Sequence, residues 1–214
     1  GVPRVPVESG GKGEDGMEQL KMYWRRQPIG RPVWPDGFHA RSFDGSKEDM
    51  GRWLLICKEG LLAPDAGEPE FRQYMLDYPD LDTRNILLIE KDGEPAATVT
   101  AVVHPLQSLG YIHMVACREK FRGQKLSQPM NAAALGVIWE AGCHGAYLTT
   151  DDFRVPAIRS YLRAGFLPVL YQEDMAQRWA AVLQAMGIHN VRALSETGEF
   201  LQLLLPDAHT ASDF

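Results

Sequence analysis

Four cationic side chains lie within eight residues of a chain whose formal net charge is −6. They are Arg118, Lys120, Arg122 and Lys125, in the segment REKFRGQK. The segment follows an apolar run typical of a strand and precedes a helical pattern. Free amides and the dipole at a helix N-terminus favour an anion, so the segment predicts a phosphate or pyrophosphate site. A solvated basic loop without a ligand is the alternative.

Glycine in this segment, and the motifs that the segment lacks, limit which kinds of phosphate site it can form. Gly123 permits a backbone turn that a side chain would obstruct. The chain contains neither GxxxxGK[ST] nor GxGxxG here, which excludes a P-loop and a dinucleotide-binding turn.

Two further groups of side chains have the chemistry to move a proton. Tyr111 and His113 lie two residues apart on one predicted strand and therefore share a face. Histidine titrates near neutrality, so His113 is a candidate base, directly or through water, with a structural role as the alternative. Asp151 and Asp152 end another apolar run and would hold a cationic amine, accept its proton, or cap the next helix.

The cysteines and the remaining histidines predict neither a disulfide framework nor a metal site. Cys57, Cys117 and Cys143 show no CxxC spacing, which fits a reducing cytoplasm. Cys117 is interpreted as a small buried hydrophobe rather than a nucleophile. Cys143-His144 has no second pair of ligands for a metal ion.

The elements that position these residues follow from the spacing of apolar side chains. Strands are predicted at 38–43, on both sides of the turn Asp92-Gly93 within 86–103, at 108–117, 146–150 and 166–171, with a closing strand at 200–205. Helices are predicted from Ser46 to Gly60 and at 69–77, 127–140, 155–165 and 175–186.

Three regions are predicted along the chain. Residues 1–37 are rich in glycine, proline and charge and are expected to form an irregular N-terminal extension. Residues 38–171 form the main domain, and 172–214 add a helix and a closing strand packed on it. The predicted fold class is α/β (α+β), a mixed, mostly antiparallel sheet with helices on both faces. A strand–helix–strand crossing through 127–140 gives its central parallel pair.

Composition limits where the protein works and what it binds. The 214 residues are 45% hydrophobic, enough for a real core, but no apolar run reaches the ~20 residues of a membrane span. No secretory signal is visible at the start, so we expect a cytoplasmic protein without a membrane partner. The acidic charge argues against nucleic acid as a partner.

The element order and two segments resemble the GNAT superfamily of acetyltransferases. The first segment is VACREKFRGQKLS (115–127); the family pattern [QR]xxGx[GA] corresponds to its Arg-Gly opening, whereas Lys125 and Ser127 occupy positions that are usually small. The second segment is AIRSYLRAGF (157–166), which matches the family pattern AxxxYxxxGF. Arg154 stands where the family often has asparagine.

The resemblance implies acetyl-CoA as cofactor and assigns residues to it. The pantetheine arm would pair with the backbone of Val115, Ala116 and Cys117, where this strand splays from its parallel neighbour 146–150. The pyrophosphate would rest on the amides of Arg122, Gly123, Gln124, Lys125, Leu126 and Ser127, and Arg154 would lie on the cofactor side. Tyr161 is the implied catalytic proton donor to the departing thiolate, with core packing as the alternative.

The function implied is acetyl transfer from acetyl-CoA to an amine by direct attack in a ternary complex. The acceptor would be a small molecule or a peptide, His113 or Asp151 would take the amine's proton, and a homodimer is compatible with the sequence. The alternative is a degenerate GNAT domain that binds acyl-CoA or a partner without catalysis.

Overall fold

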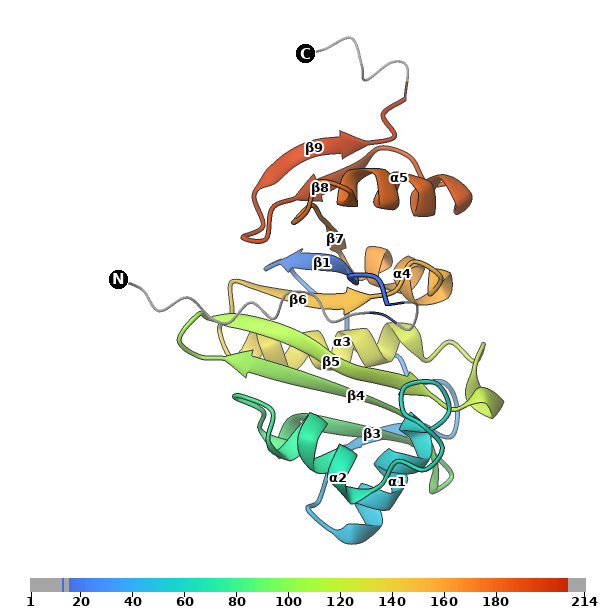
Figure 1. Ribbon diagram of the computed structural model, residues 1–214. Coiled ribbons are helices and arrows are strands. Elements are labelled where there is room, and N and C mark those ends of the chain that lie inside the picture. The colour runs from blue at the N-terminus through green and yellow to red at the C-terminus, as the bar shows by residue number, and fades with distance from the viewer. Residues whose placement is uncertain (1–12, 14–15, 208–214) are drawn as a thin grey trace. The chain divides into compact units, whose positions relative to one another are not determined.

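The computed structural model describes residue 13 and residues 16–207 of the chain (Figure 1). These residues form two units, one from Gln27 to His144 and one that combines the N-terminal part to Arg26 with the part from Gly145 onward. No helix in the described ranges combines the length and the apolarity that crossing a membrane requires.

The unit from Gln27 to His144 is built on four antiparallel strands. They follow the order β2 (Phe38–Ser42), β3 (Ile86–Lys91), β4 (Glu94–His104) and β5 (Leu109–Cys117). The predicted hairpin is confirmed: Asp92 (φ 50°) and Gly93 (φ 83°) form the turn between β3 and β4. Two positive φ angles give a turn whose twist matches that of paired strands.

Helices cover both faces of these four strands (Figure 1). The helices are α1 (Lys47–Cys57), α2 (Glu68–Phe71), the π-helical turn η1 (Arg72–Leu76), the short turns η2 (Thr83–Asn85) and η3 (Glu119–Phe121), and α3 (Ser127–Glu140). Ser46 caps α1 as predicted, because its side chain accepts a hydrogen bond from the Asp49 amide (3.1 Å).

A cluster of buried apolar side chains fixes α1 and α2 against the strands. Its members are Phe43, Trp53, Leu54, Ile56, Cys57, Phe71, Met75, Ile86 and Leu88. Met114 and Ala116 of β5 pack against this cluster. Helix α3 packs on β4 and β5 so closely that a Cβ at Gly110 would lie 2.6 Å from the Ile138 side chain. Strand β5 therefore packs against α1 on one face of the sheet and against α3 on the other.

The second unit contains a five-strand sheet with two helices. Its order is β6 (Gly145–Thr150), β1 (Leu20–Arg25), β7 (Phe166–Val169), β8 (Val191–Leu194) and β9 (Phe200–Leu204). Only the β7–β8 pair is parallel within this described unit. The helices are α4 (Val155–Arg163) and α5 (Met175–Ala185).

The predicted fold class, a mixed and mostly antiparallel α/β sheet with helices, is confirmed. The expectation that 1–37 is irregular is wrong for Leu20–Arg25, which forms β1 between β6 and β7. Five of its six residues are buried, so the strand lacks the alternation of polar and apolar residues that would have revealed it. Strand β8 was also missed. The splayed parallel pair would join strands of different units and stays a prediction, as do the boundaries at 37 and 171.

Candidate functional site

The segment between β5 and α3 presents a row of free backbone donors. In the described part of the chain, the amides of Gly123 to Ser127 donate to no other group. No side chain caps the N-terminus of the 14-residue helix α3. Gly123 has a φ of 75° and Lys125 a φ of 61°, so the chain turns twice before the helix begins. This arrangement can bind a phosphate group through its amides and the helix dipole.

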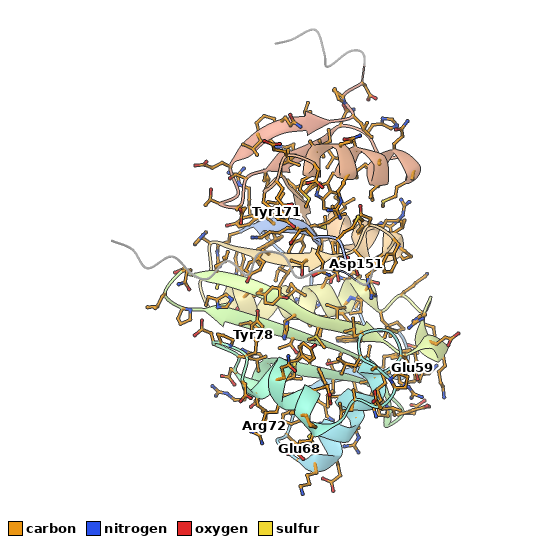
Figure 2. All side chains as sticks on the ribbon, in the orientation of Figure 1. Glu59, Glu68, Arg72, Tyr78, Asp151 and Tyr171 are labelled. Atoms are coloured by element: carbon orange, nitrogen blue, oxygen red, sulfur yellow. The ribbon has the colours of Figure 1, made fainter. Side chains whose placement is uncertain are left out.

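Two cations of the predicted basic cluster are neutralised by acidic side chains. Arg118 Nε lies 3.1 Å from Glu59 Oε1, and its Nη1 lies 3.3 Å from Glu94 Oε1. Lys120 Nζ pairs with the same Glu94 oxygen at 2.7 Å. Glu59 (labelled in Figure 2) also accepts the Glu119 amide at 2.7 Å, and that hydrogen bond, with Arg118, keeps the pKa of the Glu59 carboxyl below its usual value. These cations shape the loop.

Arg122 is also bound to the protein itself. Its Nε donates to the Cys117 carbonyl (3.1 Å), and its Nη2 donates to the Glu59 carbonyl (2.5 Å). The Arg122 amide donates to the Glu119 carbonyl at 3.1 Å. In the predicted row of amides from Arg122 to Ser127, the first donor is therefore already used by the turn η3.

Within the described residues no hydrogen bond or ion pair holds the ammonium group of Lys125. Its side chain is exposed and its backbone is left-handed, a conformation that favours glycine. Arg118 and Lys120 are thus paired with carboxylates, whereas Arg122 is held by carbonyl groups alone and Lys125 by no side-chain contact in the described residues. The neighbouring Gln124 side chain donates to the Lys120 carbonyl (3.1 Å) and stays with the loop.

Strand β5 carries a bulge that the sequence did not reveal. On β4 a single residue, Val99, separates the partners of His113 and Ala116, whereas on β5 Met114 and Val115 separate them. Met114 adopts a φ of 52°. Such bulges redirect backbone groups and side chains and are common beside active sites. The sequence does not reveal the bulge, because methionine is not one of the residue types that are common in turns and bulges.

His113, the residue before the bulge, lies beside an aromatic ring from the segment after η1. The His113 ring lies 4.2 Å from that of Tyr78 (labelled in Figure 2) and 5.2 Å from that of Tyr111, centroid to centroid. The predicted shared face of Tyr111 and His113 is confirmed. His113 Nε2 donates to the Tyr74 carbonyl at 2.7 Å. Burial lowers the pKa of His113 to about 4, so the imidazole is neutral at pH 7 and its lone pair is on Nδ1.

Cys117 is only partly buried, whereas the sequence predicted a buried side chain. The Cys117 Sγ–H points to the Arg118 carbonyl (3.6 Å), and burial raises the pKa of this thiol. A raised pKa disfavours the thiolate that a nucleophile needs. In the part of the chain that the structure describes, no group of three or more histidine, cysteine, aspartate and glutamate side chains is placed to hold a metal ion.

Tyr161 lies on α4 in the other unit and is 6% exposed. Its ring meets Phe166 edge to face with centroids 6.0 Å apart. Both motif positions thus take part in packing α4 on β7. This packing holds the ring of Tyr161 in place but does not test the function of its hydroxyl. The role of Tyr161 as proton donor therefore stays a prediction.

Asp151, at the end of β6 (labelled in Figure 2), is bound within its own unit. The side chains of Gln19 and Arg154 each donate to it at 3.2 Å. Asp152 accepts from Arg178 Nε, also at 3.2 Å. Neither carboxylate makes the predicted side-chain cap on α4. Both charges are paired with arginine, so an amine ligand would have to compete with it. Sequence reasoning missed Arg178 because it lies on α5, far along the chain.

Comparison with known proteins gives a family match. A family model described as "Acetyltransferase (GNAT) family" matches residues 47–166. A curated relative named mycothiol acetyltransferase, from Streptomyces griseus, is 26% identical over 159 residues, covering 70% of this chain and 50% of that protein. A protein of the same name from Streptomyces coelicolor is 26% identical over 171 residues, covering 76% and 52%. The chain therefore spans about half the length of these curated relatives.

Solved structures support the fold. A GCN5-related N-acetyltransferase from Sphaerobacter thermophilus superposes with a TM-score of 0.59 at 24% identity, covering 70% of this chain and 48% of that chain. A tandem GNAT protein from the clavulanic acid biosynthesis pathway gives a TM-score of 0.53 at 15% identity, covering 70% and 50%. At these identities the likeness concerns the fold alone.

Proposed function

Because the chain belongs to the acetyltransferase (GNAT) family, whose members use acetyl-CoA as acetyl donor, we propose that it transfers this acetyl group to an amine. The observation that supports the proposal most is the row of free amides from Gly123 to Ser127 at the uncapped N-terminus of α3. Amides in this position suit the pyrophosphate of coenzyme A. Lys125 adds a charge that the protein itself does not neutralise.

The reaction we propose is direct attack in a ternary complex. The amine nitrogen forms a bond with the thioester carbon, the carbon–sulfur bond breaks, and the thiolate leaves. Tyr161 is the proposed donor of the proton that the thiolate takes up, and the amine's proton goes to His113. The backbone of Val115 to Cys117 is proposed to pair with the pantetheine arm, with the Met114 bulge beside it.

The low pKa of His113 limits how this residue can act. An alkylammonium group has a pKa near 10 and His113 one of about 4, so direct deprotonation of the ammonium would be uphill by roughly 6 pKa units, about 8 kcal/mol. We therefore propose that the amine enters in its neutral form. His113 then accepts the proton after the new carbon–nitrogen bond has made that proton acidic.

The acceptor class is proposed as a small-molecule or peptide amine. The curated relatives are named mycothiol acetyltransferase, so thiol-containing amines of that kind are one class to test. The chain spans only half of those proteins, and the acceptor need not be shared. An alternative function is binding of acyl-CoA or a partner without catalysis, which Lys125, Ser127 and Arg154 favour because they depart from the family pattern.

Release of free thiol from acetyl-CoA tests the proposal. The purified chain is incubated with acetyl-CoA and panels of amino acids, polyamines, aminoglycosides, thiol-containing amines and peptides, and each product is verified by a mass gain of one acetyl group. We expect amine-dependent thiol release that Tyr161→Phe reduces strongly. Binding of acetyl-CoA without release for any class would favour the non-catalytic alternative.

A further inference from the structure

A buried hydroxyl lies opposite His113 in the sheet. Thr100 of β4 is the cross-strand partner of His113 on β5 and of Ile86 on β3. Antiparallel partners project to the same face of a sheet, with Cβ atoms about 4.5–5.5 Å apart. Thr100 is fully buried, and among the described residues no group donates to or accepts from its Oγ1. Buried hydroxyls are almost always satisfied by protein or by ordered water.

The neighbouring threonine on the same face shows how this sheet normally satisfies such a group. Thr98 is also fully buried, and its hydroxyl donates to the Leu87 carbonyl at 2.8 Å. Thr98 and Thr100 lie two residues apart on β4 and therefore share a face. Of these two buried threonines on one face, only the one opposite His113 lacks a protein partner for its hydroxyl.

The π-helical turn η1 determines which nitrogen of His113 remains available. In this turn the Asp77 amide donates to the Arg72 carbonyl and the Tyr78 amide to the Met75 carbonyl. The Tyr74 carbonyl between these acceptors takes the Nε2–H of His113 instead. The neutral ring must then carry its lone pair on Nδ1. Single π turns of this kind are frequent at functional sites.

We infer that Thr100 and His113 hold one ordered water between Thr100 Oγ1 and His113 Nδ1, and that Thr100 is a positioning residue for proton transfer to His113. The inference rests on the proposed function. The water takes the proton from the acceptor nitrogen and passes one of its own to Nδ1. One N–H bond breaks, one Nδ1–H bond forms, and the water is regenerated. The rings of Tyr78 and Tyr111 pack beside the His113 ring.

The water site is tested without turnover, on the ligand-free protein. Crystal structures and ¹⁵N spectra of the histidine side chains are compared for wild type, Thr100→Val and Thr98→Val, two matched replacements of hydroxyl by methyl. We expect the water and a hydrogen-bonded Nδ1 signal in wild type and in Thr98→Val, and the loss of both in Thr100→Val. No ordered water in wild type, or an unchanged Nδ1 signal in Thr100→Val, overturns the inference.

Kinetics test the proton route with an amine that the thiol-release screen identifies. Thr100→Val should lower kcat about 10-fold, the scale of one lost hydrogen bond, with KM for acetyl-CoA unchanged. Thr100→Ser should restore most of kcat, and Thr98→Val should retain it. Normal kcat in Thr100→Val overturns the route. If wild type releases no thiol with any amine, the proposed function and this route fail together, while the ligand-free measurements still decide the water site.

Discussion

Replacing Lys125 separates the role of its charge from the strain of its backbone. The residue has a φ of 61° and no charge partner within residues 16–207. Lys125→Ala and Lys125→Gly remove the same ammonium group. They differ in the backbone, because only glycine adopts this conformation without a steric penalty. We therefore expect the two variants to lose the same amount of affinity for the cofactor but to differ in their free energy of unfolding.

The magnitudes follow from the exposure and the conformation of Lys125. A left-handed alanine costs about 1–2 kcal/mol relative to glycine, and the greater freedom of unfolded glycine offsets roughly 0.4–1 kcal/mol of that. Lys125→Gly should therefore be more stable than Lys125→Ala by about 1 kcal/mol, or about 2–4 °C in Tm for a chain of this size. An exposed ammonium–phosphate contact predicts roughly fivefold weaker binding of coenzyme A in both variants.

Thermal unfolding gives the stability difference, and calorimetry with coenzyme A at two salt concentrations gives the affinities. The affinity loss should shrink at high salt, because exposed charge pairs are screened. Wild-type affinity in both variants would refute a phosphate contact at Lys125. Equal Tm values for the alanine and glycine variants would refute the strain argument.

Three further predictions concern the proton donor, the buried histidine and the carboxylate. Tyr161→Phe should lower kcat about 100-fold with little change in acetyl-CoA affinity; a near-normal kcat, with chemistry shown to be rate-limiting by the absence of a burst, refutes the donor role. His113 is neutral when folded, so unfolding takes up a proton between pH 6.5 and about 4. The free energy of unfolding should therefore fall by up to about 3 kcal/mol as the pH drops through this window. Denaturant titrations at several pH values should show that His113→Gln lacks this decrease. Asp151→Asn should raise KM for the acceptor more than for acetyl-CoA if Asp151 holds the amine; unchanged acceptor kinetics leave it as the partner of Arg154.

Local patterns predicted the elements that surround the site. The helix 127–140 was predicted at the bounds of α3, and the Asp92-Gly93 hairpin and the Ser46 cap are present as expected. Each of these elements depends on residues that are close together in the sequence, so their spacing and their turn-forming residue types predict it. Strand β1 was not predicted because it is buried on both faces. It therefore lacks the alternation of polar and apolar residues that predicts a strand.

The charges of the site were harder to predict than its backbone. The cluster around Arg118 and Arg122 was predicted to place four cations at a phosphate site. Glu59 and Glu94, from distant segments, bind two of these cations, and carbonyl groups bind Arg122. These contacts exist only once the tertiary fold has formed. The bulge at Met114 is likewise set by strand register and not by residue type.

The central claim is that the amides before α3 bind the phosphates of acetyl-CoA. Backbone amide spectra of the ¹⁵N-labelled chain, titrated with acetyl-CoA, test it most directly. We predict saturable shifts that are largest for Gly123 to Ser127 and that coenzyme A reproduces. Amides outside this loop and outside the strand segment Val115 to Cys117 should shift less. Saturating acetyl-CoA that leaves Gly123 to Ser127 unmoved would contradict the claim.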